Sequence, residues 1–221
     1  MQMTAEWRLT KKLSPVQTLS AVERGNELGY GRLGSHPREK LASDLAQIID
    51  APVPVVSIEQ INGEVFTISR VANQKSYPLL EKGQQRDYTG SELAALRAAS
   101  GLICFLLWVG AEDQSDDTNL VVNSTASGLE ICAIDFEHAF GQFLRDDYFG
   151  AASEPPALKL NPDPKLIEAA LIKIENVPMR DIRRSCCASG HTKEESLRIA
   201  QKLIVRKSML RDYLVKQGWI E

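Results

Sequence analysis

The chain has 221 residues, of which 43% are hydrophobic and 25% are charged, values typical of a globular protein. This length suits one large domain or two packed lobes, whose core needs neither disulfides nor a structural metal. The formal net charge of −3 gives no reason to expect nucleic-acid binding.

The start of the sequence, Met1-Gln2-Met3-Thr4-Ala5-Glu6-Trp7, has no apolar core of the kind found in secretory signals. We therefore expect a cytoplasmic protein with free thiols at Cys104, Cys132, Cys186 and Cys187. The adjacent pair Cys186-Cys187 with His191 lacks the four ligands of a zinc site, so we expect these thiols to pack between helices.

The first 71 residues are rich in strand signals and contain one helix. The patterns predict a hairpin over Ala21–Tyr30, a helix over Arg38–Asp50 and strands over Val53–Ile58 and Glu64–Arg70. The two strands are joined at Asn62-Gly63, the strongest short hairpin signal. A polar passage follows, and we interpret residues 72–87 as a linker.

A long helix is predicted over Glu92–Val109, and its apolar second half is expected to be buried. The longest apolar stretch, Ala98–Val109, is about a dozen residues, whereas a membrane span needs about 20, so we expect no membrane insertion. Two short strands are predicted at Leu120–Val122 and Leu129–Ile134.

The C-terminal part is predicted to be helical. Asp163-Pro164 combines an N-cap with proline at the first helical position, so a helix is expected from there through Ile174. Thr192 and Glu195 form a capping box that begins a helix of some two dozen residues, ending before Gly218. The exposed basic residues of these helices are interpreted as a solvated face.

Three polar residues stand at the ends of the elements in the middle of the chain. A buried helix leads into a loop with Asp113, Asn119 closes that loop, and Asp135 follows the second strand. Phosphoryl transfer from ATP needs a carboxylate near the acceptor hydroxyl and hard oxygen ligands for Mg²⁺. A hairpin bracketed by Asn119 and Asp135 can bring an amide oxygen and a carboxylate to one metal ion.

The same residues carry a resemblance. Gly110-Ala111-Glu112-Asp113, with Asn119-Leu120-Val121-Val122, resembles the catalytic loop of the HipA-like and phosphatidylinositol-kinase branches of the kinase superfamily. Ile134-Asp135-Phe136-Glu137-His138-Ala139-Phe140-Gly141 resembles their metal-binding segment. The resemblance implies an α+β, two-lobed protein-kinase-like fold, with an N-lobe at 1–71, a hinge region at 72–87 and a helical C-lobe at 88–221.

The resemblance also implies a site for ATP and Mg²⁺. Asp113 would orient and deprotonate the acceptor, while Asn119 and Asp135 would hold Mg²⁺. The remaining implied residues contact nucleotide: Arg32 at the position of the ATP-binding lysine with Asp44 as its carboxylate partner, Ser14 and Gln17 in the loop over the phosphates, and Ser69, Arg70 and Val71 at the adenine hinge. The plain alternatives are turn-capping and solvated side chains.

This sequence departs from the family pattern at several points. Asp113 and Asn119 are six residues apart where the family has five. Gln114 and Ser115 replace basic residues, and Arg32 replaces lysine, which is not equivalent to arginine at such a site. The main hypothesis is a HipA-like serine/threonine protein kinase with a protein substrate and a neutralising or regulatory partner of the toxin–antitoxin kind. The alternatives are a pseudokinase that binds nucleotide without transfer, and an enzyme that transfers AMP.

Overall fold

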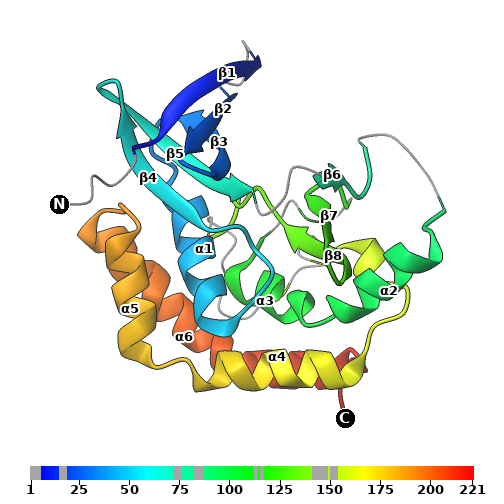
Figure 1. Cartoon of the computed structure of the whole chain (residues 1–221). Coiled ribbons are helices and arrows are strands. Elements are labelled where there is room, and N and C mark those ends of the chain that lie inside the picture. Colours follow the sequence, from blue (N-terminus) through cyan, green and yellow to red (C-terminus); the bar gives the residue numbers. More distant parts are fainter. Residues whose placement is uncertain are drawn as a thin grey trace.

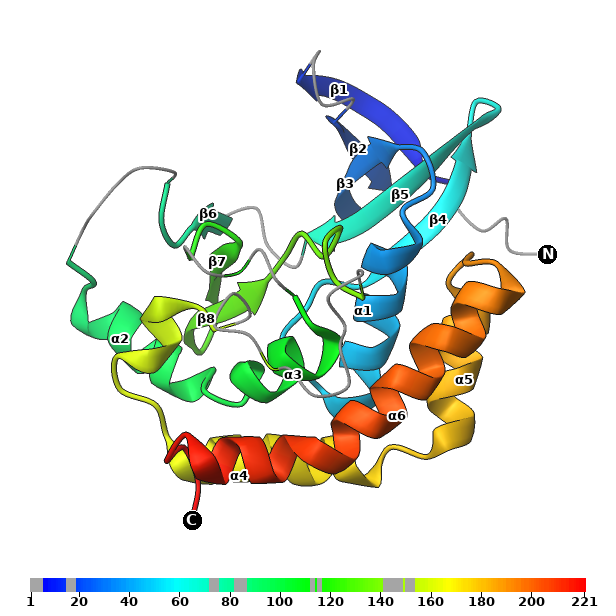
Figure 2. The same ribbon diagram turned by 180° about the vertical axis from the view of Figure 1, so that it is seen from behind.

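The computed structural model describes residues 6–14, 19–71, 76–81, 87–111, 114, 117–140, 149 and 154–221. A five-stranded antiparallel sheet and one helix come first along the chain, and a small sheet with the remaining helices follows (Figures 1 and 2). A strand-rich N-terminal part and a helical C-terminal part are what the sequence predicts.

The first sheet has the strand order β1-β2-β3-β5-β4. Its strands are β1 (Arg8–Ser14), β2 (Leu19–Arg24), β3 (Glu27–Leu33), β4 (Val56–Ile61) and β5 (Glu64–Val71). Both predicted hairpins are confirmed, because β2 turns into β3 at Gly25-Asn26 and β4 turns into β5 at Asn62-Gly63. The expected strand at Val53 starts later, at Val56, because Pro52 and Pro54 have no N–H to donate to a sheet.

The helix α1 (Pro37–Ile49) lies between β3 and β4 in the chain and confirms the predicted helix. It buries Leu41, Ala42, Leu45 and Ala46 completely. Its C-cap residue, Asp50, is left-handed with φ 54°, a conformation that Asp tolerates better than most residues. The helix therefore ends just before the proline-containing segment that leads to β4.

The second sheet has the strand order β6-β7-β8 and belongs to the helical part of the molecule. The strands are β6 (Ser76–Pro78), β7 (Leu120–Thr125) and β8 (Gly128–Ala133). Part of the segment interpreted as a linker thus forms β6, which pairs with β7. In the β7–β8 hairpin, β7 continues past the predicted end at Val122 to Thr125, and β8 begins at Gly128, before the predicted start at Leu129.

One long helix was expected over Glu92–Val109, and the structure has two helices instead. These are α2 (Gly90–Ala98) and α3 (Leu102–Val109), bent by 57°. Gly101 lies at the break, where a Cβ would come within 2.8 Å of the Ala170 Cβ, so the chain passes too close to the next helix for a side chain. The Ser100 hydroxyl bonds the Arg97 carbonyl and accepts from the Asp163 N–H, which fixes the bend.

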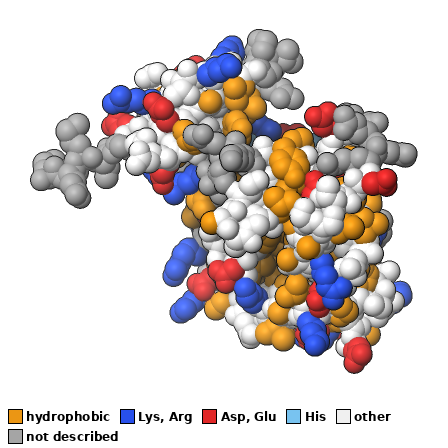
Figure 3. All heavy atoms as spheres, turned by 45° about the vertical axis from the view of Figure 1, so that its right-hand side comes forward, with side chains coloured by type: hydrophobic (Ala, Val, Ile, Leu, Met, Phe, Trp, Pro, Cys, Tyr) orange, Lys and Arg blue, Asp and Glu red, His pale blue; other side chains and the backbone are white. Residues whose placement is uncertain are grey.

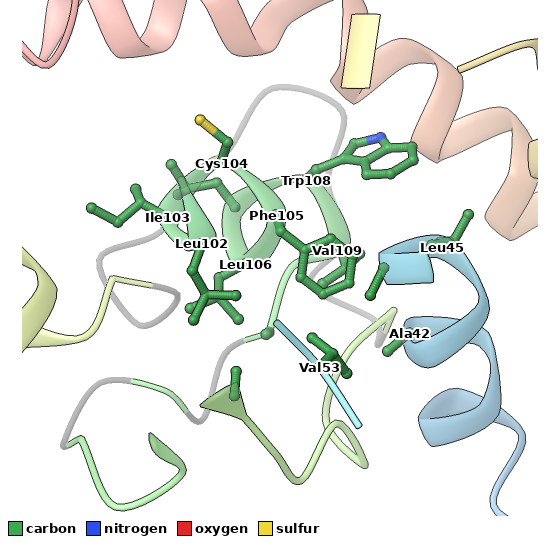
Figure 4. Close-up of a cluster of buried hydrophobic side chains, with 14 of the residues drawn as sticks. Ala42, Leu45, Val53, Leu102, Ile103, Cys104, Phe105, Leu106, Trp108 and Val109 are labelled. Atoms are coloured by element: carbon green, nitrogen blue, oxygen red, sulfur yellow. The ribbon is translucent and has the colours of Figure 1, made fainter. Parts of the chain in front are cut away.

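The main hydrophobic core surrounds α3, whose eight side chains are all buried. Figure 4 shows Val109 and Phe105 near Ala42 and Leu45 of α1 and near Val53, while Trp108 points toward the C-terminal helices. The Trp108 indole N–H donates to the Leu203 carbonyl at 3.0 Å. The prediction of a buried apolar helix is confirmed.

The remaining helices follow β8 in the chain, and α5 and α6 lie beside α1 (Figures 1 and 2). They are the 3₁₀ turn η2 (Pro156–Lys159), α4 (Pro164–Asn176), α5 (Met179–Ala188) and α6 (Lys193–Lys216). The Asp163 N-cap and the Thr192 capping box are confirmed. Within the described residues, no single helix is long and apolar enough to cross a membrane, and α2 with α3 meets that test only as a bent pair.

Candidate functional site

The β7–β8 hairpin places Asn119 beside the residues that follow β8. Leu120 pairs with Ala133 in the hairpin, and one step further the Asn119 carbonyl accepts from the Ile134 N–H at 2.9 Å. Asp135 is the next residue. The hairpin thus brings the backbones of two residues 16 positions apart in the sequence close together.

Asp135 has a left-handed backbone and an unsatisfied carboxylate oxygen. Its φ is 59°, a conformation that few residues other than glycine, Asn and Asp adopt and that is found in turns and at functional sites. Its Oδ1 atom is buried and has no hydrogen-bond partner among the described residues. A buried carboxylate oxygen without a donor is costly unless a ligand or water completes it.

The segment after Asp135 is anchored in the main core. Phe136 is 2% exposed and meets the Phe105 ring of α3 edge to face, with ring centroids 5.9 Å apart. The Phe140 N–H donates to the carbonyl of Val109 at the end of the same helix. The main core therefore fixes the position of Asp135 through the contacts of Phe136 and Phe140 with α3.

Arg32 of β3 approaches Asp135 from the first sheet. Its Nη2 lies 3.7 Å from the Asp135 Oδ2, and its Nη1 donates to Glu39 Oε1 at 3.2 Å and to Glu137 Oε2 at 2.9 Å. The expectation that Asp44 is its carboxylate partner is wrong, because Asp44 pairs with Lys40 within α1. Asp44 comes five residues after Glu39, more than one helical turn of 3.6 residues, and so faces another side.

Glu137 and Arg38 complete this polar contact between the two parts of the molecule. Arg38, in the first turn of α1, donates from Nη1 to the Glu137 carbonyl at 2.9 Å. Sequence reasoning missed both Glu39 and Glu137. Their positions in the sequence could have indicated both, because Glu39 lies in the first turn of the helix that follows β3 and Glu137 lies two residues after Asp135.

Gln114, noted in the sequence only as a departure from the family pattern, is completely buried. Its Nε2 donates to the Ile134 carbonyl at 3.1 Å, and its Oε1 is buried without a hydrogen-bond partner among the described residues. The residue in place of the family's basic side chain thus supports the backbone immediately before Asp135. Asp113, the predicted base, lies outside the described residues.

A cleft of about 970 Å³ opens between the first sheet and the β7–β8 hairpin. Ser69 and Arg70 of β5 line it, as do Arg32, Glu39 and Asp135; among its described lining residues Asn119 is not included. The predicted Gln17, and the side chains of Ser14 and Val71, lie outside what the structure describes. Such a volume is within the range of small-molecule and cofactor sites.

The floor of the cleft includes Cys132 of β8. Asn123 donates from Nδ2 to the Cys132 sulfur at 3.0 Å and accepts from the Ser76 hydroxyl at 2.6 Å. Burial raises the pKa of the Cys132 thiol to about 12, and the charge of Glu130 acts in the same direction. The thiol is therefore neutral at physiological pH and contributes an apolar surface to the floor.

The donor set near Asp135 fits Mg²⁺ bound together with a phosphate ligand. Among the described residues, no group of three or more His, Cys, Asp or Glu side chains could hold a metal ion alone. Mg²⁺ commonly uses only one or two carboxylates and completes its shell with phosphate oxygens and water. The unsatisfied Oδ1 of Asp135 and the side-chain amide oxygen of Asn119 are the atoms that could serve as protein ligands.

The comparisons with solved structures decide the fold. The Helicobacter pylori proinflammatory kinase CtkA matches with a TM-score of 0.56 at 11% identity, over 91% of this chain and 95% of that chain. The chain has a protein-kinase-like fold. The predicted two-lobed α+β class is thereby confirmed.

Two further matches have lower scores and add nothing to this conclusion. HipA of Shewanella oneidensis MR-1, in a toxin–antitoxin complex with HipB and operator DNA, matches with a TM-score of 0.44 at 14% identity, over 94% of this chain and 66% of that chain. A protein from Ralstonia eutropha JMP134 described as an aminoglycoside phosphotransferase matches with 0.43 at 10% identity, over 97% and 94%. No family profile and no curated protein matches the sequence.

Arg32 is on β3 and Glu39 is on α1, the helix that follows it in the chain. Their ion pair, with 3.2 Å between Arg32 Nη1 and Glu39 Oε1, therefore joins the sheet to its helix at the edge of the cleft.

Proposed function

We propose that this protein is an ATP- and Mg²⁺-dependent phosphotransferase of the HipA-like serine/threonine kinase type, acting in the cytoplasm. The observation that carries the proposal is Asp135, a left-handed residue with a buried, unsatisfied carboxylate oxygen in a cleft between the two lobes. The protein-kinase-like fold supports the same assignment.

Each predicted site residue has one role in this proposal. Asp135 and Asn119 would hold Mg²⁺, which when bound neutralises charge on the phosphates. Arg32, oriented by Glu39, would contact the phosphates from the first sheet. Asp113 orients the acceptor hydroxyl and accepts its proton. Ser69 and Arg70 line the cleft and would contact the base.

The acceptor in this proposal is a serine or threonine hydroxyl of another protein. A regulatory or neutralising protein partner would control the activity, as the resemblance to HipA-like kinases implies. The proposed acceptor protein and the proposed regulatory partner both depend on the nucleotide site proposed for this cleft.

A nucleotide-binding protein without transfer activity is the second candidate, and two observations favour it. Arg32 is held by Asp135 and Glu137 as well as by Glu39, so the cation is shared among three carboxylates. Gln114 is buried against the Ile134 carbonyl, where the family has a basic residue. Both arrangements are compatible with binding and reduce the positive charge available for transfer.

Labelled ATP separates these functions. We expect the wild type to be stabilised against heat by ATP with Mg²⁺ and to transfer the γ-phosphate to a protein acceptor, and D135N to lose the Mg²⁺-dependent part of both. D50N is the matched control, since Asp50 is another left-handed aspartate that does not line the cleft. D113A should lose transfer and keep the stabilisation.

Each other result points elsewhere. Stabilisation without transfer to a broad panel of protein acceptors supports the pseudokinase. Label that is transferred only from the α-phosphate identifies AMP transfer. A wild type that responds to neither ATP nor Mg²⁺ contradicts nucleotide binding at this cleft altogether.

A further inference from the structure

Arg32 contacts three carboxylates that come from two parts of the molecule. Its Nη1 lies 3.2 Å from Glu39 Oε1 and 2.9 Å from Glu137 Oε2, and its Nη2 lies 3.7 Å from Asp135 Oδ2. Arg38 adds a second guanidinium, which donates to the Glu137 carbonyl. Two positive and three negative side chains leave this group with a formal charge of −1. A polyphosphate that approaches Arg32 therefore meets a group that is negative overall.

Charge elsewhere in the molecule gives a polyphosphate little help. The formal net charge of the chain is −3, so the molecule as a whole does not attract anions. On the face drawn in Figure 3, acidic and basic side chains are interspersed, with no broad basic surface among the described residues there. Attraction of phosphate groups then depends on the balance of arginines and carboxylates close to the cleft.

The three carboxylates differ in how easily each can leave Arg32. The side chain of Glu39 is 10% exposed, that of Asp135 32% and that of Glu137 45%. A carboxylate that stays buried without its partner is costly, whereas an exposed carboxylate is rehydrated when its ion pair opens. Glu137 is also not among the described residues that line the cleft. It is therefore the partner of Arg32 that a phosphate group can replace most easily.

We infer that Glu137 determines specificity at the phosphate end of the cleft, because it excludes metal-free polyphosphate by competing with it for Arg32. Metal-free ATP has only negative charge at its phosphate end, and Glu137 already occupies the cation there. Mg²⁺ bound to the phosphates cancels part of that charge, so the complex replaces Glu137 at a smaller electrostatic cost. A repulsive group is a common means of discriminating between related ligands. The inference rests on the proposed nucleotide site and adds a residue that selects the metal-bound form of the nucleotide.

Binding of ATP to the wild type and to E137Q, with Mg²⁺ or with a chelator, tests this inference by calorimetry. E137Q keeps the size of the side chain and removes its charge. We expect E137Q to bind metal-free ATP about fivefold or more tightly than the wild type, because one like charge close to the phosphates is removed. The affinity for ATP with Mg²⁺ should rise by a smaller factor.

E64Q is the matched control for E137Q. Glu64 is exposed at the start of β5 and is not among the described residues that line the cleft. The substitution makes the same change in net charge and should leave both affinities unchanged.

Two further measurements separate competition for Arg32 from a general effect of charge. R32Q should weaken binding of ATP with and without Mg²⁺, and E137Q added to R32Q should raise the affinity for metal-free ATP by less than E137Q alone does. High salt screens exposed charges, so the difference between E137Q and the wild type should shrink as the salt concentration rises. The thermal midpoint of each variant checks that it is folded at the temperature of the measurement.

The outcomes distinguish this inference from the function on which it rests. If the wild type binds ATP and E137Q binds the metal-free form no more tightly, the competition is wrong and the proposed function stands. The inference is also wrong if E137Q raises the affinity for both forms by the same factor, or gains as much when Arg32 is absent. If the wild type binds ATP neither with Mg²⁺ nor without it, the proposed function fails and the inference fails with it.

Discussion

The two lobes hold their halves of the cleft by different means. On the helical side, Asp135 is attached through Phe136 to a large core that includes every side chain of α3. On the sheet side, the core is a separate cluster of five residues, Trp7, Val22, Ile61, Phe66 and Ile68. Arg32 is positioned there by ion pairs and hydrogen bonds.

This difference separates stability from ligand binding. Burial of apolar area dominates folding free energy, so the larger cluster should dominate the free energy of unfolding. Partly exposed ion pairs contribute little to stability, which leaves Arg32 free to exchange its partners when a ligand binds. Substitutions in the helical core should therefore unfold the protein, while substitutions on the cleft face of β3 should change binding.

The strongest test removes the anchor of Asp135. F136A should lower the free energy of unfolding by about 3–5 kcal/mol, because it leaves a cavity in the main core. F136L retains most of the volume and should lose much less. Urea denaturation of the two variants measures the difference. Equal and small losses would show that the core does not hold this segment.

A buried cation at the end of α3 gives the next largest effect. Arg206 is 1% exposed, donates from Nε to the Trp108 carbonyl at 3.1 Å and from Nη2 to the Leu107 carbonyl, and lies over the Phe149 ring. R206M should lower the free energy of unfolding by about 2–4 kcal/mol, because it removes the donor to the buried Trp108 carbonyl and the second donor to the Leu107 carbonyl.

Arg198, on the same helix α6 but exposed, is the control for Arg206. R198M should change the free energy of unfolding by less than about 0.5 kcal/mol. Both variants would be compared in the same denaturation experiment. A loss of similar size in both would mean that charge on α6, and not the buried contacts at the end of α3, stabilises the fold.

The small core of the sheet can be tested through its glycines. In G31A the new Cβ would meet the Val22 Cγ1 at 2.9 Å, so the sheet must shift. We expect a loss of about 1–3 kcal/mol, as for overpacked cores. G90A is the control, because nothing lies within 4 Å of its new Cβ and alanine favours a helix. A neutral G31A would mean that the sheet core is loosely packed.

Much of the fold could be predicted from local signals in the sequence. The Asn62-Gly63 turn, the Asp163 N-cap and the Thr192 capping box each act within a few residues, so they specify element ends. The break between α2 and α3 could not be predicted in this way. It depends on the close approach of Gly101 to Ala170, a contact between residues far apart in the chain.

The same limit applies to the candidate site. The order of Asn119, the hairpin and Asp135 was visible because pairing within one hairpin is local. The partner of Arg32 was not, because it depends on which face α1 turns toward β3, and the sequence pattern suited Asp44 as well as Glu39. The roles of Asp113, Gln17 and Val71 stay predictions.

A histidine, His191, lies in the turn between α5 and α6. The turn between α5 and α6 lies against the start of α1: a Cβ on Gly190 would be 3.8 Å from Pro37. In this turn the Ser189 hydroxyl donates to the Cys186 carbonyl, so it accepts from the His191 Nδ1–H at 2.7 Å. The Ser189 hydroxyl therefore holds the His191 ring within the turn that lies against the start of α1.

Burial lowers the pKa of His191 below its usual value of 6.5; Glu195 opposes this shift and Arg38 adds to it. A group with a lowered folded pKa stabilises the fold above its unfolded pKa, and this stability is lost as the pH falls below about 6.5. H191Q keeps a polar side chain and removes the titration. We expect the wild type to lose more thermal stability than H191Q between about pH 7 and pH 5. Thermal midpoints across this range measure the difference, and H138Q, at a histidine with 63% side-chain exposure, should follow the wild type. Parallel curves for H191Q and the wild type would show that this turn does not couple the lobes to pH.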